Sequence, residues 1–169
     1  MKQAGCVRVF FGIESGNNSV LALMNKQATV SEARDAVEVV KLAGIQAGAF
    51  FIIGYPDETE STVLDTVRFA SSLPLDYLSF TLPYPIPGTS LYERMKDRLV
   101  SEEWREPKHR HLIEHKLVYD SSLSESKLKF AILKALAQFR LRKYLDSHVY
   151  WFVGEPFEHL TDCIFRLLH

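Results

Sequence analysis

The chain has 169 residues, with 20 lysines and arginines against 21 aspartates and glutamates, so its formal net charge is −1 at pH 7. Hydrophobic residues make up 47% of the sequence, enough for a chain of this length to bury a core without a metal or a disulfide. This composition excludes a mainly disordered chain. The balanced charge also argues against a dedicated binder of nucleic acid or of an anionic membrane.

The chain has two cysteines, Cys6 and Cys163, near its opposite ends. This spacing fits neither a disulfide framework nor a zinc motif, so we expect two small buried thiols and no resident metal. No segment approaches the roughly 20 apolar residues that span a bilayer, and no signal-peptide core is present. We therefore expect no membrane or nucleic-acid partner and a cytosolic location.

Three short apolar runs predict β-strands at residues 7–13, 48–53 and 77–82. The middle run is apolar at every position, which is typical of a strand that is covered on both faces. The phenylalanines in these runs are expected to be core residues: Phe10, Phe11, Phe50, Phe51 and Phe80.

Two amphipathic helices separate the strands. The first begins with a capping box at Thr29 and ends near Gly44, and the second is capped by Asp57 or Thr59 and ends before Pro74. Strands that alternate with helices at this spacing predict right-handed βαβ units and a parallel sheet.

Three parallel strands make only part of a barrel, and they leave residues 7–13 as an apolar edge with only Arg8 to protect it. Residues 1–5 have the pattern of the last turn and cap of a helix. We therefore expect that the chain enters its fold partway through, and that the isolated chain self-associates or aggregates.

A helical region follows the strands. A proline-rich loop precedes a helix over 91–99, a long helix begins after Ser121 or Ser124, and a last short helix lies within 151–168. The expected fold is thus an α/β partial (β/α) barrel over residues 1–98 with a helical extension over 99–169. The basic residues of the long helix are expected to face solvent: Lys127, Lys129, Lys134, Arg140 and Arg142.

Parallel sheets bind ligands at the carboxyl ends of their strands. Glu14 follows the first strand between two glycines, where a carboxylate can accept hydrogen bonds from an ammonium or a ribose hydroxyl. It could equally be a carboxylate that favours the start of the next helix. Tyr55 and Tyr84 lie just beyond the other two strands, where each ring can line a cleft while its hydroxyl stays wet.

A separate alternative comes from the H-x-x-E-H pattern at residues 111–115. On a helix His111 and His115 would share a face and could bind zinc, with Glu114 as the base of a hydrolase. Positive charge around this pattern, from Lys108 and Arg110, favours a polar surface segment instead.

Four segments together carry a family resemblance. They are A-G-C-V-R-V-F-F-G-I-E-S-G (4–16), M-N-K (24–26), F-I-I-G-Y-P-D-E-T (51–59) and Y-P-I-P-G-T-S-L-Y (84–92). In order and spacing the chain resembles the second half of a radical S-adenosylmethionine (SAM) enzyme. The resemblance is strongest to the subgroup that often carries an N-terminal cobalamin-binding domain, so cobalamin is a further cofactor of that parent subgroup.

The resemblance implies that this chain supplies the last three strands of a (β/α)₆ barrel and part of its SAM site. The residues that it assigns to SAM are Gly12, Glu14, Ser15, Lys26, Ile52 and Gly54. Of these, Glu14 and Ser15 would bond amino or ribose groups, Lys26 the carboxylate and Ile52 the adenine. The residues that would border the substrate, an unknown small molecule, are Tyr55, Tyr84, Pro85 and Pro87.

The cysteine triad C-x-x-x-C-x-x-C of that family is absent from these 169 residues. Without three thiolates the chain cannot hold a [4Fe–4S] cluster, and no catalytic residue is assigned. We therefore expect an inactive part of a radical SAM enzyme, which another polypeptide would have to complete. The alternative is a non-catalytic half-barrel that binds or pairs, and the zinc hydrolase is a third interpretation.

Overall fold

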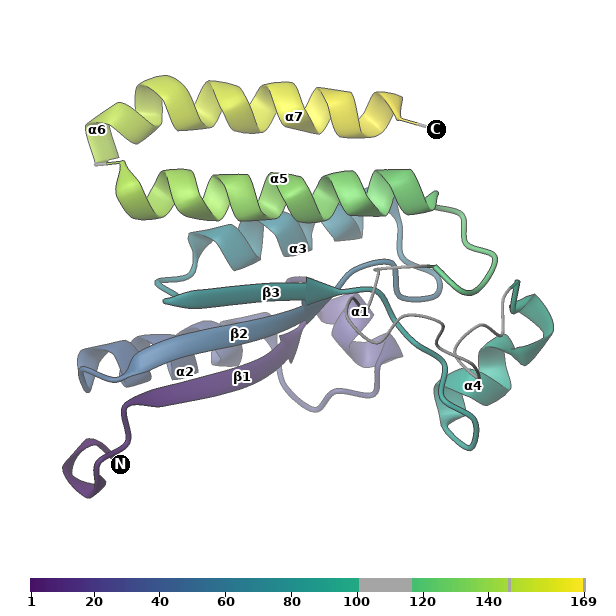
Figure 1. Ribbon diagram of the computed structural model, residues 1–169, viewed down its shortest axis with the longest axis horizontal. Helices are drawn as coiled ribbons and strands as arrows, with labels where there is room; N and C mark the ends of the chain where they lie inside the picture. Colours follow the sequence, from purple (N-terminus) through teal and green to yellow (C-terminus); the bar gives the residue numbers. More distant parts are fainter. Residues whose placement is uncertain (101–116, 146, 169) are drawn as a thin grey trace, which may run out of the picture.

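A computed structural model of the protein describes residues 1–100, 117–145 and 147–168. Strands and helices alternate first, and helices follow (Figure 1). In chain order the elements are η1 (Lys2–Ala4), β1 (Arg8–Glu14), α1 (Asn18–Leu23), α2 (Val30–Leu42), β2 (Gln46–Ile52), α3 (Glu60–Ser72), β3 (Tyr77–Thr81), α4 (Ser90–Met95), η2 (Lys96–Arg98), α5 (Glu125–Tyr144), α6 (Ser147–Val149), the π-helical turn η4 (Tyr150–Gly154) and α7 (Glu155–Leu167).

The three strands form one parallel sheet in the order β1-β2-β3, which confirms the predicted α/β fold. Phe10 of β1 lies opposite Gly48 of β2, and Gly48 lies opposite Tyr77 of β3. In the part of the chain that the structure describes, β1 pairs with no second strand, so it is an edge as predicted.

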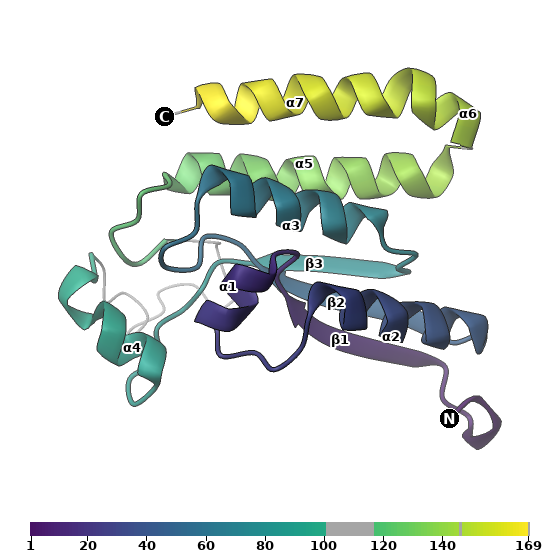
Figure 2. The ribbon, with the colours of Figure 1, turned by 180° about the vertical axis from the view of Figure 1, so that it is seen from behind.

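The apolar core lies on the side of the sheet that α2 and α3 cover (Figure 2). Val37 of α2 and Val67 of α3 are fully buried against this side, together with Phe51 of β2. Capping boxes begin both helices, at Thr29 with Glu32 and at Thr59 with Thr62. Of the two caps that the sequence offered for α3, the structure uses Thr59.

The opposite side of the sheet is open, and here the prediction of a fully covered middle strand is wrong. Phe10 is 48% exposed and Phe50 is 47% exposed, although both were expected in the core. Their rings stack with centroids 5.4 Å apart, and Arg8 lies over the neighbouring Tyr77 ring at 4.0 Å. Phe51 and Phe80 are buried as predicted, because their side chains point to the side that the helices cover.

The C-terminal helices form two further layers, with α5 packed on α3 and α7 on the outer side of α5 (Figures 1 and 2). Ser124 caps α5 by accepting a hydrogen bond from the Lys127 N–H. The prediction that all basic residues of this helix face solvent is wrong, because Lys127 and Lys134 are buried. Lys127 pairs with Glu60 of α3, and the ammonium of Lys134 lies 2.8 Å from Asp162 of α7.

Three local features also differ from the predictions or sharpen them. The six-residue helix α1 was not predicted, although Asn17 caps it. Cys163 is exposed and Cys6 is partly exposed, so neither is the buried thiol that was expected. Gly5 has a left-handed φ of 84° and ends η1, so residues 1–5 do have the expected form of a capped turn.

No helix in the described ranges is both long and apolar enough to cross a membrane.

Candidate functional site

The carboxyl end of β1 places Glu14 over a glycine. Glu14 has a left-handed backbone with a φ of 72°, and the pairing of β1 with β2 shifts register between Gly12 and Glu14. A Cβ atom at position 12 would lie 2.6 Å from Glu14 Oε1, so the carboxylate folds back closely over the Gly12 backbone. The result is a partly exposed carboxylate at the rim of the open sheet face.

Lys26 faces this carboxylate. Helix α1 ends at Leu23, and Asn25 just beyond it has a left-handed φ of 55°. The Lys26 N–H closes the turn on the Leu21 carbonyl at 2.9 Å. This turn directs the side chain back to β1, where Lys26 Nζ donates to Glu14 Oε1 at 3.5 Å. The structure thus brings together Gly12, Glu14 and Lys26, three of the residues that the resemblance assigned to SAM.

Ser15 lies below the rim and is fully buried. Its hydroxyl lies 3.0 Å from the Thr66 hydroxyl of α3 and accepts from the Asn17 N–H at 3.2 Å. The Gly16 N–H also donates to Thr66 Oγ1. Ser15 therefore anchors the loop that carries Glu14 to α3, and its hydroxyl does not reach the open side.

A tight turn, residues 54–58, follows the carboxyl end of β2. Gly54 and Asp57 have left-handed φ angles of 85° and 71°. The side chain of Glu58 folds back so that Oε2 accepts from the Gly54 N–H at 2.7 Å and from the Tyr55 N–H at 2.9 Å. Glu58 is only 3% exposed, and its Oε1 atom has no partner among the described residues.

Burial raises the pKa of Glu58 to about 7, although the two N–H groups favour its ionised form. The sequence interpretation did not single out this residue. A signal was present, because a glutamate four residues after a strand-end glycine can bond back to that glycine's N–H group.

The C-terminal region covers the same turn. The Tyr119 hydroxyl donates to the Gly54 carbonyl, and a Cβ atom on Gly54 would lie 2.5 Å from Leu128 of α5. Both backbone polar groups of Gly54 are therefore bonded within the protein. Ile52, two residues earlier, is half-buried on the open sheet face. Tyr119 lies 65 residues from Gly54 in the sequence, so no local pattern could have predicted this contact.

The rim beyond β3 holds the remaining predicted residues. Tyr84 is 42% exposed, and burial of part of the side chain raises the pKa of its phenol. Pro85 is buried, whereas Pro87 is exposed, and Tyr55 beyond β2 is half-buried.

Arg94 of α4 links the strand ends, and the sequence interpretation had not identified it. Its guanidinium lies 6.0 Å from the Tyr55 ring centre and donates to Asp57 and to the Leu23 carbonyl, each at 3.4 Å. It thereby joins α4 to the turn after β2 and to the end of α1.

Taken together, the rim offers a carboxylate beside an ammonium, next to an open sheet face. This pair is complementary to a ligand that carries both an ammonium and a carboxylate. Within the described ranges no cluster of three histidine, cysteine or acidic side chains could hold a metal ion. The zinc candidates His111, Glu114 and His115 lie outside the described residues.

Residues 1–70 match the Radical SAM superfamily. An uncharacterized methyltransferase of Pyrococcus horikoshii is 42% identical over 107 residues, which are 62% of this chain and 23% of that protein. An anaerobic magnesium-protoporphyrin IX monomethyl ester cyclase of Cereibacter sphaeroides is 24% identical over 96% of this chain and 26% of that protein. The chain therefore spans about a quarter of the length of these curated relatives.

The fold also resembles a solved structure, the archaeal Elp3 of Methanocaldococcus infernus with an N-terminal deletion. The TM-score is 0.53 at 15% identity, over 83% of this chain and 28% of that one. This similarity supports the partial barrel architecture.

Proposed function

We propose, from the premise that this chain is a radical SAM superfamily chain, that it supplies one wall of a SAM-binding cleft. The observation that carries the proposal is the pair of Glu14 and Lys26 at the rim of the open sheet face. SAM has an amino-acid end with one ammonium and one carboxylate. Glu14 would accept from the ammonium, and Lys26 would donate to the carboxylate.

The ion pair between Glu14 and Lys26 is long and partly exposed, so each side chain can bond to SAM in place of the other. Lys26 Nζ and Glu14 Oε1 are 3.5 Å apart, and their side chains are 36% and 25% exposed. Such an exposed and long ion pair contributes little to folding, so a ligand can replace it at small cost. Ile52 would contact the adenine from the half-buried face of β2, and Gly12 leaves room for the Glu14 carboxylate.

Other assigned residues would act around this pair. Ser15 would hold the Glu14 loop against α3 through Thr66, and Gly54 would shape the strand end beside Ile52. Tyr55, Tyr84, Pro85 and Pro87 would border the side on which a small-molecule substrate enters.

The residues of this chain do not fit the [4Fe–4S] cluster on which radical SAM chemistry depends. Such a cluster needs neighbouring thiolates, whereas Cys6 lies before the start of β1 and Cys163 lies on α7, far from each other in the fold. In the family the cluster supplies the electron that cleaves SAM. We therefore propose that these 169 residues by themselves are not catalytic, and that activity requires cluster ligands from outside them.

A second candidate function is a half-barrel module that pairs with another chain. It is favoured by the half-exposed rings of Phe10 and Phe50, and by the edge of β1, which pairs only with β2 among the described residues. An apolar sheet face and an open edge are typical sites of association. The partner would be a second copy of this chain or another polypeptide.

Titration calorimetry with SAM tests the first proposal. We expect the wild-type chain to bind SAM, and Glu14→Gln to weaken binding roughly tenfold, because a charge-assisted hydrogen bond is lost. Glu38→Gln, a substitution of an exposed glutamate on α2, is the matched control and should bind as the wild type. Equal affinities of the wild type and Glu14→Gln would refute the role of Glu14.

Two further measurements test the proposals about the cluster and about pairing. After anaerobic reconstitution with iron and sulfide, we expect the chain alone to retain no stoichiometric iron. Light scattering should show that the chain self-associates. A stable monomer that binds no SAM would contradict both proposals.

A further inference from the structure

The turn after β2, residues 54–58, is held from two directions. Glu58 holds it from within, through the hydrogen bonds from the N–H groups of Gly54 and Tyr55. Tyr119 holds it from outside, by donating its hydroxyl to the Gly54 carbonyl. Gly54 and Asp57 both have left-handed backbones, a region that glycine enters freely and that aspartate enters more readily than most other residues.

Tyr119 is itself firmly placed. It is 1% exposed and pairs with Leu99 in an antiparallel bridge, and the flanking hydrogen bonds join Val100 to Val118 and Asp120 to Arg98 at 2.9 and 2.8 Å. Val118 and Met95 complete a small apolar cluster around the ring. The phenol is thus fixed by the segment that follows α4, independently of the turn that it contacts.

The chemistry of the contact favours a neutral donor at every physiological pH. Burial and the nearby Glu58 carboxylate raise the pKa of the Tyr119 phenol, so the hydroxyl proton stays on its oxygen. Gly54 itself is buried, beneath Leu128. A carbonyl in such surroundings has few other donors if the phenol is removed.

We infer that Tyr119 is a positioning residue of the cleft: its hydroxyl fixes the Gly54 carbonyl and thereby the strand end from Ile52 to Tyr55. This inference rests on the proposed function, in which Ile52 contacts the adenine and Tyr55 borders the substrate side. Under this inference the helical extension is part of the ligand site through Tyr119, which acts on the turn after β2 and not on the rim pair Glu14 and Lys26.

The test compares Tyr119→Phe with Tyr144→Phe in the full 169-residue chain. Each substitution removes one phenolic oxygen, and Tyr144 is 77% exposed at the end of α5. Glycine labelled with ¹³C at the carbonyl gives a direct spectroscopic signature of the hydrogen bond to Gly54. Hydrogen exchange measures how firmly the Gly54 and Tyr55 N–H groups are held, and calorimetry gives the affinity for SAM.

For Tyr119→Phe we expect the Gly54 carbonyl resonance to shift and the N–H groups of Gly54 and Tyr55 to exchange roughly tenfold faster. Exchange in α2 should stay unchanged, as should every signal in Tyr144→Phe. SAM binding should weaken severalfold in Tyr119→Phe alone. An unchanged Gly54 resonance and unchanged exchange would overturn the inference, whether or not the chain binds SAM.

Two outcomes separate this inference from the proposal on which it rests. Faster local exchange with unchanged SAM affinity would refute the positioning role, because the turn would then not matter to the ligand. Absence of SAM binding in the wild type would refute the proposed function and, with it, the positioning role in a SAM cleft. Uniformly faster exchange throughout the chain would show a global loss of stability, which also contradicts a local role.

Discussion

Apolar packing holds the β/α part of the molecule together, whereas the helical extension combines apolar packing with buried lysines. Between the sheet and its helices the buried contacts are apolar, as at Phe51, Val37 and Val67, which are all fully buried. Between α5 and α7 a charged side chain is buried in addition to the apolar Phe165, since Lys134 has no exposed side-chain surface and lies 2.8 Å from Asp162. Apolar packing tolerates small shifts in geometry, whereas a buried ion pair requires its partners in defined places.

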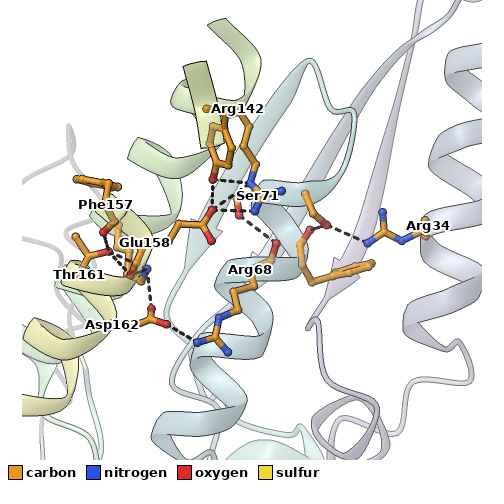
Figure 3. Close-up of polar contacts among 12 residues, drawn as sticks. Arg34, Arg68, Ser71, Arg142, Phe157, Glu158, Thr161 and Asp162 are labelled. Carbon is orange, nitrogen blue, oxygen red and sulfur yellow. Dashed lines mark hydrogen bonds and ion pairs between the residues drawn. The ribbon is translucent and has the colours of Figure 1, made fainter. Parts of the chain in front are cut away.

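The charged contacts between α3, α5 and α7 form a connected network (Figure 3). Asp162 pairs with both Lys134 and Arg68, and Lys134 also donates to the Thr161 hydroxyl at 2.9 Å. Burial alone would raise the pKa of Asp162, but the hydrogen bonds from these two cations hold it below its ordinary value. Arg142 and Glu158 add a second pair at 2.8 Å. These pairs therefore favour one defined arrangement of α5 and α7 on α3.

The largest expected effect is in the apolar part. Phe51→Ala should lower the free energy of unfolding by about 4 kcal/mol, because a fully buried ring is lost and a cavity remains. Phe50→Ala is the matched control, since its ring is 47% exposed and should cost much less. Urea unfolding measures both, and equal costs would contradict the assignment of the covered and open sheet faces.

Removal of the buried ammonium should have the next largest effect. Lys134→Met should destabilise the chain by about 3 kcal/mol, because Asp162 then keeps a buried charge with only Arg68 to pair it. Lys129→Met, at a side chain that is 48% exposed, should change stability little. Recovery of stability in the double variant Lys134→Met with Asp162→Leu would show that the single loss comes from the unpaired charge.

A pH dependence of stability is expected from Glu58. Its pKa is raised from 4.5 to about 7 in the folded chain, so the folded state keeps a proton that the unfolded state releases in this range. The free energy of unfolding should therefore rise as the pH falls from 7 to 4.5, by as much as roughly 3 kcal/mol. In Glu58→Gln this rise should be absent, which urea unfolding at a series of pH values can check.

The smallest expected effect concerns a helix cap. Thr29→Ala removes the side chain that accepts the Glu32 N–H at the start of α2, and should cost about 1 kcal/mol. Ser31→Ala, an exposed position in the first turn of the same helix, should cost less. Thermal unfolding measures the two, and a larger loss for Ser31→Ala would contradict the cap.

Much of the fold could be predicted from local signals. These signals are the three apolar runs of the strands, the capping box at Thr29, the cap at Thr59 (predicted as one of two candidates) and the start of the long helix after Ser124. Each depends on residues within a few positions of one another. The short helix α1 escaped prediction because six residues carry too little periodicity, although Asn17 is a good cap. The strand-end position already indicated Glu14, and the family resemblance added Gly12 and Lys26; the structure brings the three together at one rim.

The sequence by itself determined the order of strands and helices, their caps and the glycines at their ends, because these depend on short-range backbone chemistry. Only the tertiary structure decided which face of the sheet stays open, that Lys134 is buried, and that Tyr119 reaches Gly54. Each of these depends on residues far apart in the chain. Their burial and pairing are set by the packing of whole elements, which no local pattern records.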